Sequence, residues 1–104
     1  MIFVKKHATE QGPIVAMCDE ELLGKVLKQG KLLIDLEKYA EFYKGDLLSE
    51  EEAWGHVRED EIYSANVVGE RSVAIMVRKG IVQKDEIKKV GKVPFVQVYN
   101  VAIF

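Results

Sequence analysis

The chain has 104 residues, of which 48% are hydrophobic and 31% charged, and its formal net charge is −2. This length predicts a single domain over 1–104, and the balance of apolar and charged residues excludes a disordered chain. No apolar run approaches the ~20 residues that a membrane-spanning helix requires, so we expect no membrane association. The small net charge excludes a protein that is basic over its whole surface.

Cys18 is the single cysteine of the chain. One thiol cannot form an internal disulfide, and no set of cysteines and histidines has metal-ligand spacing, so we expect neither metal nor cofactor. The absence of a secretory signal and of a disulfide framework favours a cytoplasmic protein. The excess of Glu and Lys over Asn and Gln is typical of thermophile proteins, and equally of a helical surface rich in charge.

The net charge conceals a strong asymmetry along the chain. Residues 35–61 carry three basic and ten acidic side chains, whereas residues 62–104 carry seven basic and three acidic ones. The middle and last thirds are therefore electrostatically opposite.

The first third predicts a hairpin followed by a helix. Residues 2–7 and 14–18 are β-prone runs around a polar loop, and the second is apolar on both faces, which predicts a central strand. Asp19 is placed to cap a helix over 19–29, and Gly30 is placed to end it.

The middle third predicts a strand and two helices. Residues 31–36 form a strand pattern, and 37–45 present aromatic side chains with either helical or irregular spacing. Ser49 and Glu52 form a capping box, which predicts a helix start. We expect that helix to bury Ala53, Trp54 and Val57.

The last third predicts a long helix and a closing strand. Residues 62–79 have a helical pattern, and the alternative is a break near Gly69 with a new helix beginning at Glu70. Residues 81–82 and 86–90 are short strand candidates. Pro94 precedes a final strand over 95–104, which is apolar on both faces and belongs inside the sheet. The expected fold class is α+β: a mixed β-sheet with about three helices packed mainly on one side.

The chain offers no catalytic set. His7 and His56 are the only histidines, and His56 follows Glu52 by four residues, where the two can pair on a helix surface. Cys18 ends an apolar strand and precedes three acidic residues, which would raise its pKa. We interpret Cys18 as a core residue rather than as a nucleophile. We interpret the acids as helix caps rather than as a Mg²⁺ site.

An anion site is possible near Gly69. If a helix begins there, its backbone N–H groups, the Arg71 guanidinium and the Ser72 hydroxyl could hold a phosphate or carboxylate. Glu70 opposes this interpretation because it can occupy the same positive helix end.

Basic side chains accumulate in the last third, and such a strip could contact RNA phosphates. The alternative is a solvated face that pairs with the acidic segment 35–61, within one chain or in a homodimer. The aromatic residues of the acidic segment are interpreted as core or protein-contact residues. The candidates for nucleic-acid or anion binding are Arg71, Ser72, Arg78, Lys88, Lys89 and Lys92.

Four segments together resemble an archaeal family of uncharacterised proteins, domain of unknown function 424. They are residues 16–25 (AMCDEELLGK), 42–45 (FYKG), 65–74 (ANVVGERSVA) and 93–98 (VPFVQV). The resemblance implies a small archaeal protein and a loose connection with translation, but no catalytic residue. It draws attention to polar and glycine positions, and we expect Gly24 and Gly69 to bring two helices together. Asp19, Lys25, Asn66 and Arg71 would then surround one groove.

The sequence therefore predicts a non-enzymatic binding module accessory to RNA or a ribonucleoprotein. The first alternative is a small-ligand binder or an enzyme that uses the groove near Asp19, Lys25, Asn66 and Arg71. The second is a protein–protein adaptor or homodimer without nucleic acid.

Overall fold

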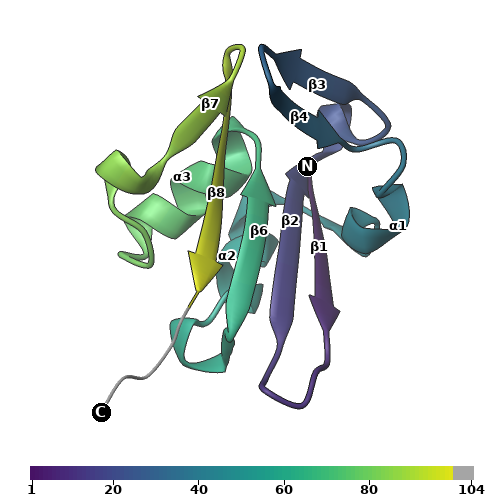
Figure 1. The fold of residues 1–104 in the computed structure, drawn as a ribbon. Coiled ribbons are helices and arrows are strands. Elements are labelled where there is room, and N and C mark those ends of the chain that lie inside the picture. The colour runs from purple at the N-terminus through teal and green to yellow at the C-terminus, as the bar shows by residue number, and fades with distance from the viewer. Residues whose placement is uncertain (100–104) are drawn as a thin grey trace.

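A mixed six-stranded sheet organises the protein (Figure 1), whose computed structural model describes residues 1–99. The strand order is β5-β1-β2-β6-β8-β7. The central strands β2 and β6 are parallel, and every other neighbouring pair is antiparallel. The strands are β1 (Ile2–His7), β2 (Ile14–Asp19), β5 (Asp46–Leu48), β6 (Ser64–Val68), β7 (Lys88–Val90) and β8 (Val93–Tyr99).

A separate antiparallel hairpin and three helices complete the fold. The hairpin consists of β3 (Val26–Gln29) and β4 (Leu32–Asp35), and the helices are α1 (Ala40–Tyr43), α2 (Glu50–His56) and α3 (Glu70–Arg78). Short 3₁₀ turns occupy Glu20–Leu22, Glu59–Glu61 and Lys84–Glu86. This arrangement confirms the expected α+β class with a mixed sheet.

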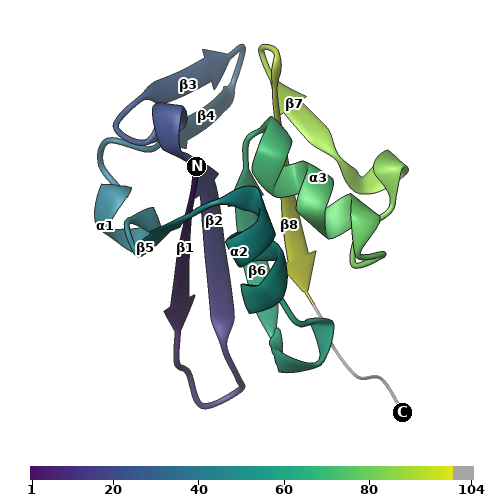
Figure 2. The same ribbon diagram turned by 180° about the vertical axis from the view of Figure 1, so that it is seen from behind.

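Different elements pack on the two faces of the sheet. Helices α2 and α3 lie behind the sheet in Figure 1 and in front of it in Figure 2, whereas the β3–β4 hairpin and α1 lie at the opposite face. A hydrophobic core lies on each face of the sheet, and β2 contributes side chains to both because side chains alternate along a strand. Val15 and Met17 face the helices, while Ala16 and Cys18 face the hairpin. All four are buried, which confirms that β2 is a central strand.

The expected helix over 19–29 is wrong. Only Glu20–Leu22 turns, as a 3₁₀ segment, and β3 follows. Gly24 and Gly30 have φ angles of +90° and +60°, which a right-handed helix does not allow. The Gly24 N–H donates to the Leu36 carbonyl at 2.9 Å, so this stretch pairs with the chain beyond β4 instead.

The alternative proposed for residues 62–79 is correct and the continuous helix is wrong. Strand β6 ends at Val68, Gly69 has a φ of +113°, and α3 begins at Glu70. The β-branched pair Val67 and Val68 is buried on the two faces of the sheet, which favours a strand over a helix at this position.

The C-terminal part confirms two strands and corrects a third. Strand β8 lies inside the sheet, between β6 and β7, and β7 lies within the candidate range 86–90. Residues 81–82 form no strand: the N–H groups of both donate to the Met76 carbonyl and extend the end of α3. The expected continuation of the last strand over 100–104 lies outside the described residues.

The capping box that starts α2 is present in full. The Glu52 N–H donates to Ser49 Oγ, and the Ser49 N–H donates to Glu52 Oε1, each at 3.1 Å. The helix buries Ala53, but the prediction for Trp54 is wrong, because its side chain is 41% exposed beneath the Lys79 ammonium. Among residues 1–99, no helix is long and apolar enough to cross a membrane.

Candidate functional site

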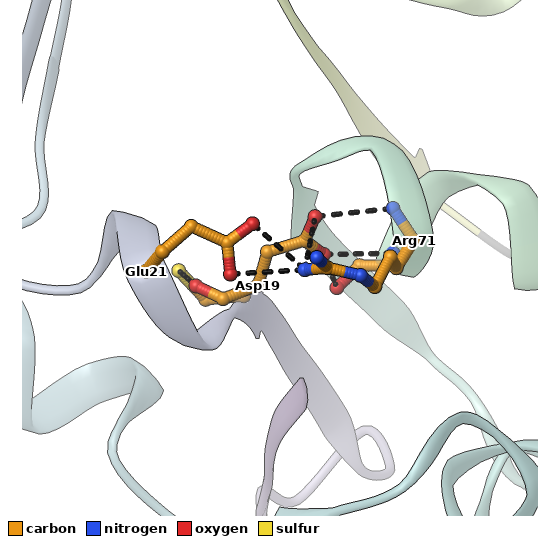
Figure 3. A network of polar contacts seen from close by, with 5 residues as sticks. Asp19, Glu21 and Arg71 are labelled. Carbon is orange, nitrogen blue, oxygen red and sulfur yellow. Dashed lines mark hydrogen bonds and ion pairs between the residues drawn. The ribbon is translucent and has the colours of Figure 1, made fainter. Parts of the chain in front are cut away.

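Asp19 lies at the end of β2 and caps α3, rather than a helix of its own. Its side chain is buried, and its Oδ1 accepts hydrogen bonds from the Ser72 N–H at 2.9 Å and the Ser72 hydroxyl at 2.8 Å. Oδ2 accepts from the Arg71 N–H at 3.1 Å (Figure 3). The first turn of α3 thus receives its carboxylate from a residue more than fifty positions earlier in the chain.

Arg71 is held by the same end of β2. Its Nη1 donates to both carboxylate oxygens of Glu21, at 2.7 and 2.9 Å, and lies 3.8 Å from Asp19 Oδ2. A hydrogen bond to its own backbone N–H lowers the pKa of Glu21, and Arg71 lowers it further. We call Asp19, Glu21, Arg71 and Ser72 the α3 cap network.

The anion position considered at Gly69–Ser72 is therefore filled from within the chain. The N–H groups of Arg71 and Ser72, which would have bound an external phosphate, already donate to Asp19. Gly69 permits this approach, because a Cβ there would overlap the Asp19 carboxylate. The network is a structural cap that joins β2 to α3.

Cys18 is buried beside this network and does not resemble a nucleophile. Burial raises its pKa to about 12, and the neighbouring Asp19 and Glu21 carboxylates add to the effect. Both histidines also contact backbone carbonyl oxygens. His7 Nε2 lies 2.8 Å from the Phe42 carbonyl oxygen and its ring stacks on Phe42, while His56 Nδ1 lies 2.9 Å from the Glu52 carbonyl oxygen.

Two hairpins carry a concentration of positive charge. Residues 23–34 and 87–99 contain six lysines and no acidic residue. Within residues 1–99, none of these six ammonium groups lies within 4.0 Å of a carboxylate oxygen. We call this set the hairpin lysines: Lys25, Lys28, Lys31, Lys88, Lys89 and Lys92.

The two hairpins meet at their tips. The N–H of Gly91, in the β7–β8 turn, donates to Oε1 of Gln29, beside the β3–β4 turn, at 2.6 Å. Strands β3 and β4 lie against β7, and both views show the two tips side by side (Figures 1 and 2). All six hairpin lysines are exposed. One end of the molecule therefore presents lysines from segments that are some sixty residues apart in sequence.

The remaining basic candidates lie elsewhere. Arg78 is exposed at the last turn of α3, seven residues after Arg71, and lines a shallow hollow together with acidic Glu59 and Asp60. Lys92 shares a second hollow with Glu70 and Arg71. The structure thus groups Lys88, Lys89 and Lys92 with the β3–β4 hairpin, and places Arg78 with acidic neighbours.

The four polar groove candidates do not share a cavity within the described chain. Asp19 and Arg71 line the hollow beside Lys92, whereas Asn66 lines a larger pocket on the hairpin face of the sheet. Lys25 is exposed at the start of the hairpin and lines neither. Gly24 lies in a turn with nothing within 4 Å of its missing Cβ, so it brings no helix close to Gly69.

The larger pocket has a volume of about 530 Å³ and lies between β4, α1, β6 and β8. Its walls are mainly apolar, and Asn66 and Gln97 supply neighbouring amides on its sheet side. Leu33 and Tyr39, which also line it, are each 56% exposed. No group of three or more His, Cys, Asp and Glu side chains among residues 1–99 could hold a metal ion.

Sequence reasoning missed Lys28, Lys31 and Gln97 as site residues. The signal for the lysines was present: Lys25, Lys28 and Lys31 recur every three residues around Gly30 without an intervening acid. It was hidden because the acids at positions 10 and 19–21 reduce the net charge of residues 1–34. Gln97 could not be found without the register that places it opposite Asn66.

Comparison with known proteins agrees with the resemblance seen in the sequence. A crystal structure of an uncharacterised conserved protein from the archaeon Methanopyrus kandleri has a TM-score of 0.80 and 28% identity, over 99% of this chain and 96% of that one. A search of curated proteins found no match. The family described as "protein of unknown function (DUF424)" matches residues 7–101, and the chain belongs to this family.

Proposed function

We propose that this protein is a cytoplasmic, non-enzymatic binding module that holds RNA, free or within a ribonucleoprotein, through the hairpin lysines. The observation that carries the proposal is the concentration of six exposed lysines on two joined hairpins without a carboxylate partner among the described residues. Lysine ammonium groups bind phosphate as point charges and tolerate different backbone geometries.

Two features of the site support a polyanion over a small anion. The lysines come from both hairpins and from their turns, so they spread over a surface instead of converging on one point. The helix end that could have held a single phosphate is filled by Asp19. A chain of phosphates matches such a distribution better than one phosphate does.

The acidic groups of the proposed catalytic groove, Asp19 and its neighbour Glu21, already bind other residues of the chain. Asp19 is buried and accepts three hydrogen bonds from α3, and Arg71 is bound by Glu21. This supports a binding role over the alternative of a polar catalytic groove.

The test measures binding of a fluorescein-labelled 12-nucleotide RNA of mixed sequence by fluorescence anisotropy. We expect binding at ~50 mM salt and a fall in affinity of about 300-fold at ~200 mM salt if all six lysines contact phosphates of this single strand. The variant K28E/K89E should lose at least about tenfold in affinity at the lower salt.

The matched control is K44E/K84E, which changes the net charge by the same amount at exposed lysines away from the hairpin tips. It should retain most of the affinity. No binding of this RNA at ~50 mM salt, or equal losses in the two variants, would contradict the proposal.

A homodimer or protein adaptor is the second candidate, favoured by the exposure of Leu33 and Tyr39 at the rim of the large pocket. The acidic segment 35–61 of one copy could face the hairpin lysines of another. Light scattering at low and high salt tests it, because such a dimer should dissociate as salt screens the charges.

A further inference from the structure

The large pocket lies directly beside the hairpin lysines. Leu32, which follows Lys31 in the turn, lines the pocket, and so does Phe95 of β8. Lys88 is the cross-strand partner of Phe95, so both side chains leave the sheet on the same face. Positive charge therefore borders an apolar hollow at two points.

The pocket also offers an ordered pair of amides. Gln97 Nε2 donates to Asn66 Oδ1 at 3.0 Å across the β6–β8 pair. This bond leaves the side-chain oxygen of Gln97, Oε1, as an acceptor and the side-chain nitrogen of Asn66, Nδ2, as a donor. A neighbouring donor and acceptor match the edge of a nucleobase, which presents the same combination.

The walls of the pocket are aromatic and apolar, which suits the faces of a nucleobase. Tyr39, Phe42 and Phe95 line the pocket together with leucine and valine side chains. Aromatic and apolar surfaces bind any base through its face. Asp35 also lines the pocket, but its Oδ1 is occupied by the N–H groups of Glu37 and Lys38, at 3.1 and 2.8 Å.

We propose that this pocket takes one unstacked base of a single-stranded RNA, with the Asn66–Gln97 amide pair at its edge and Lys31 and Lys88 on the adjoining phosphates. The inference rests on the proposed function and adds to it a source of base preference. Single-stranded RNA is recognised in this way in general, by splayed bases against aromatic side chains.

Charge complementarity favours RNA over an apolar peptide. An apolar peptide would fit the walls equally well, but it would bring no phosphate to the lysines at the rim. A nucleotide satisfies both parts of the site, the apolar hollow and the positive border, with one ligand.

The experiment compares four fluorescein-labelled 12-mers at ~50 mM salt: rU12, rC12, rA12 and an abasic ribose-phosphate strand. We expect the preferred homopolymer to bind at least about tenfold more tightly than the abasic strand, because base–aromatic stacking adds to the phosphate contacts. The variant N66A/Q97A should reduce the spread among the three homopolymers to about threefold or less, without changing the affinity for the abasic strand.

Gln11→Ala is the matched control, since it removes an exposed amide from the β1–β2 loop, away from the pocket. It should leave all four affinities unchanged. Circular dichroism verifies that each variant is folded.

The outcomes separate the two proposals. If all four strands bind alike and N66A/Q97A has no effect, the base pocket is overturned while the lysine surface stands. If no strand binds, the proposed function fails and the pocket inference fails with it. A dimer that forms without RNA and is abolished by N66A/Q97A would assign the pocket to a second copy and overturn the inference.

A second measurement needs no substitution. The unmodified protein is irradiated with an RNA 12-mer containing 5-iodouridine, and the crosslinked peptide is identified by mass spectrometry. A crosslink to Tyr39, Phe42 or Phe95 supports the proposal. Crosslinks confined to other residues overturn it even if the amide variant fails to fold.

Discussion

Two regions of positive charge lie close together in this protein and have opposite relations to their surroundings. Arg71 belongs to the α3 cap network, where Glu21 and Asp19 accept its charge. The hairpin lysines have no carboxylate within 4.0 Å in the described part of the chain. Lys92 shares a hollow with Arg71, so the two regions are neighbours in space.

The difference shows that counting charge along a sequence does not distinguish structural cations from available ones. Arg71 neutralises carboxylates that hold the fold together, so its charge is satisfied internally. The hairpin lysines repel one another and, in residues 1–99, have no carboxylate partner that offsets this repulsion. Such a surface favours the binding of an anion. The α3 cap network should therefore control stability, whereas the hairpin lysines should control binding.

The largest expected effect on stability comes from Asp19→Ala. The substitution removes an acceptor of three hydrogen bonds and leaves two N–H groups at a buried helix end without partners. We expect the free energy of unfolding to fall by about 3 kcal/mol, measured by urea denaturation.

The control is Asp46→Ala, an exposed aspartate, which should change stability by less than about 0.5 kcal/mol. The folded fraction of D19A should still bind RNA with the affinity of the original protein. A loss of RNA affinity comparable to that of K28E/K89E would contradict the separation of the two regions.

Gly69→Ala should have the next largest effect. Its φ of +113° is unfavourable for alanine, and the added Cβ would overlap the Asp19 carboxylate. We expect a loss of about 2 kcal/mol by the same measurement. Gly55→Ala in α2 is the opposite case, since open space surrounds its Cβ position, and it should stabilise by about 0.5 kcal/mol. Equal effects at the two positions would exclude a special role for Gly69.

The sequence revealed the local features of this fold better than its long-range ones. The capping box at Ser49 and the first hairpin depend on neighbouring residues, and both were predictable. The pattern Leu22, Leu23, Val26, Leu27 fits a helix equally well, and only the pairing of β3 with β4 favours a strand. Local periodicity contains no information about that partner.

The site was less predictable than the fold, for the same reason. Asp19 has the residue type of an N-cap, and it is one, but the helix that it caps is α3 and not the next segment of chain. The β7–β8 lysines were identified from charge alone. Their association with Lys28 and Lys31 depends on the contact between Gln29 and Gly91, which connects residues 62 positions apart.

The third prediction concerns how the free energy of unfolding changes at alkaline pH, through two groups in the core beside the α3 cap network. Burial raises the pKa values of Cys18 and Tyr43 to about 12, so the folded state retains protons that the unfolded state releases. The stabilising contribution is fully present below the ordinary pKa values, 9.0 for the thiol and 10.0 for the phenol, and is lost as the pH rises toward 12.

Each group contributes a slope of at most about 1.4 kcal/mol per pH unit in this range. Cys18→Ala should therefore show a shallower decline in unfolding free energy between pH 9 and pH 12, measured by urea denaturation. An unchanged slope would show that Cys18 ionises as readily in the folded state as in the unfolded one.

Arg71→Gln tests the ion pair by itself and should affect stability less than the changes at Asp19 or Gly69. Both partners are about half exposed, where solvent screens the attraction. The pKa of Glu21 should rise part of the way toward its ordinary value of 4.5, because the backbone hydrogen bond remains. The stabilisation linked to Glu21 is present above that value and is lost as the pH falls through the lowered pKa. NMR titration of Glu21 measures the shift, and Arg78→Gln, which removes a cation at the opposite end of α3, serves as the control.

The smallest effect, and the sharpest contrast, is expected when Lys28, Lys31, Lys88 and Lys92 are all changed to Gln. These lysines lack carboxylate partners among residues 1–99, so their neutralisation removes repulsion. It should raise the thermal midpoint by about 2 °C at ~10 mM salt, but not at ~0.5 M, where charges are screened. The mixed-sequence RNA should stabilise the original protein and not this variant. A lower midpoint at low salt would mean that the lysines support the fold as Arg71 does, and the distinction between the two regions would disappear. A raised midpoint together with the loss of stabilisation by RNA would show that the hairpins hold mutually repelling charges whose partner is outside the chain.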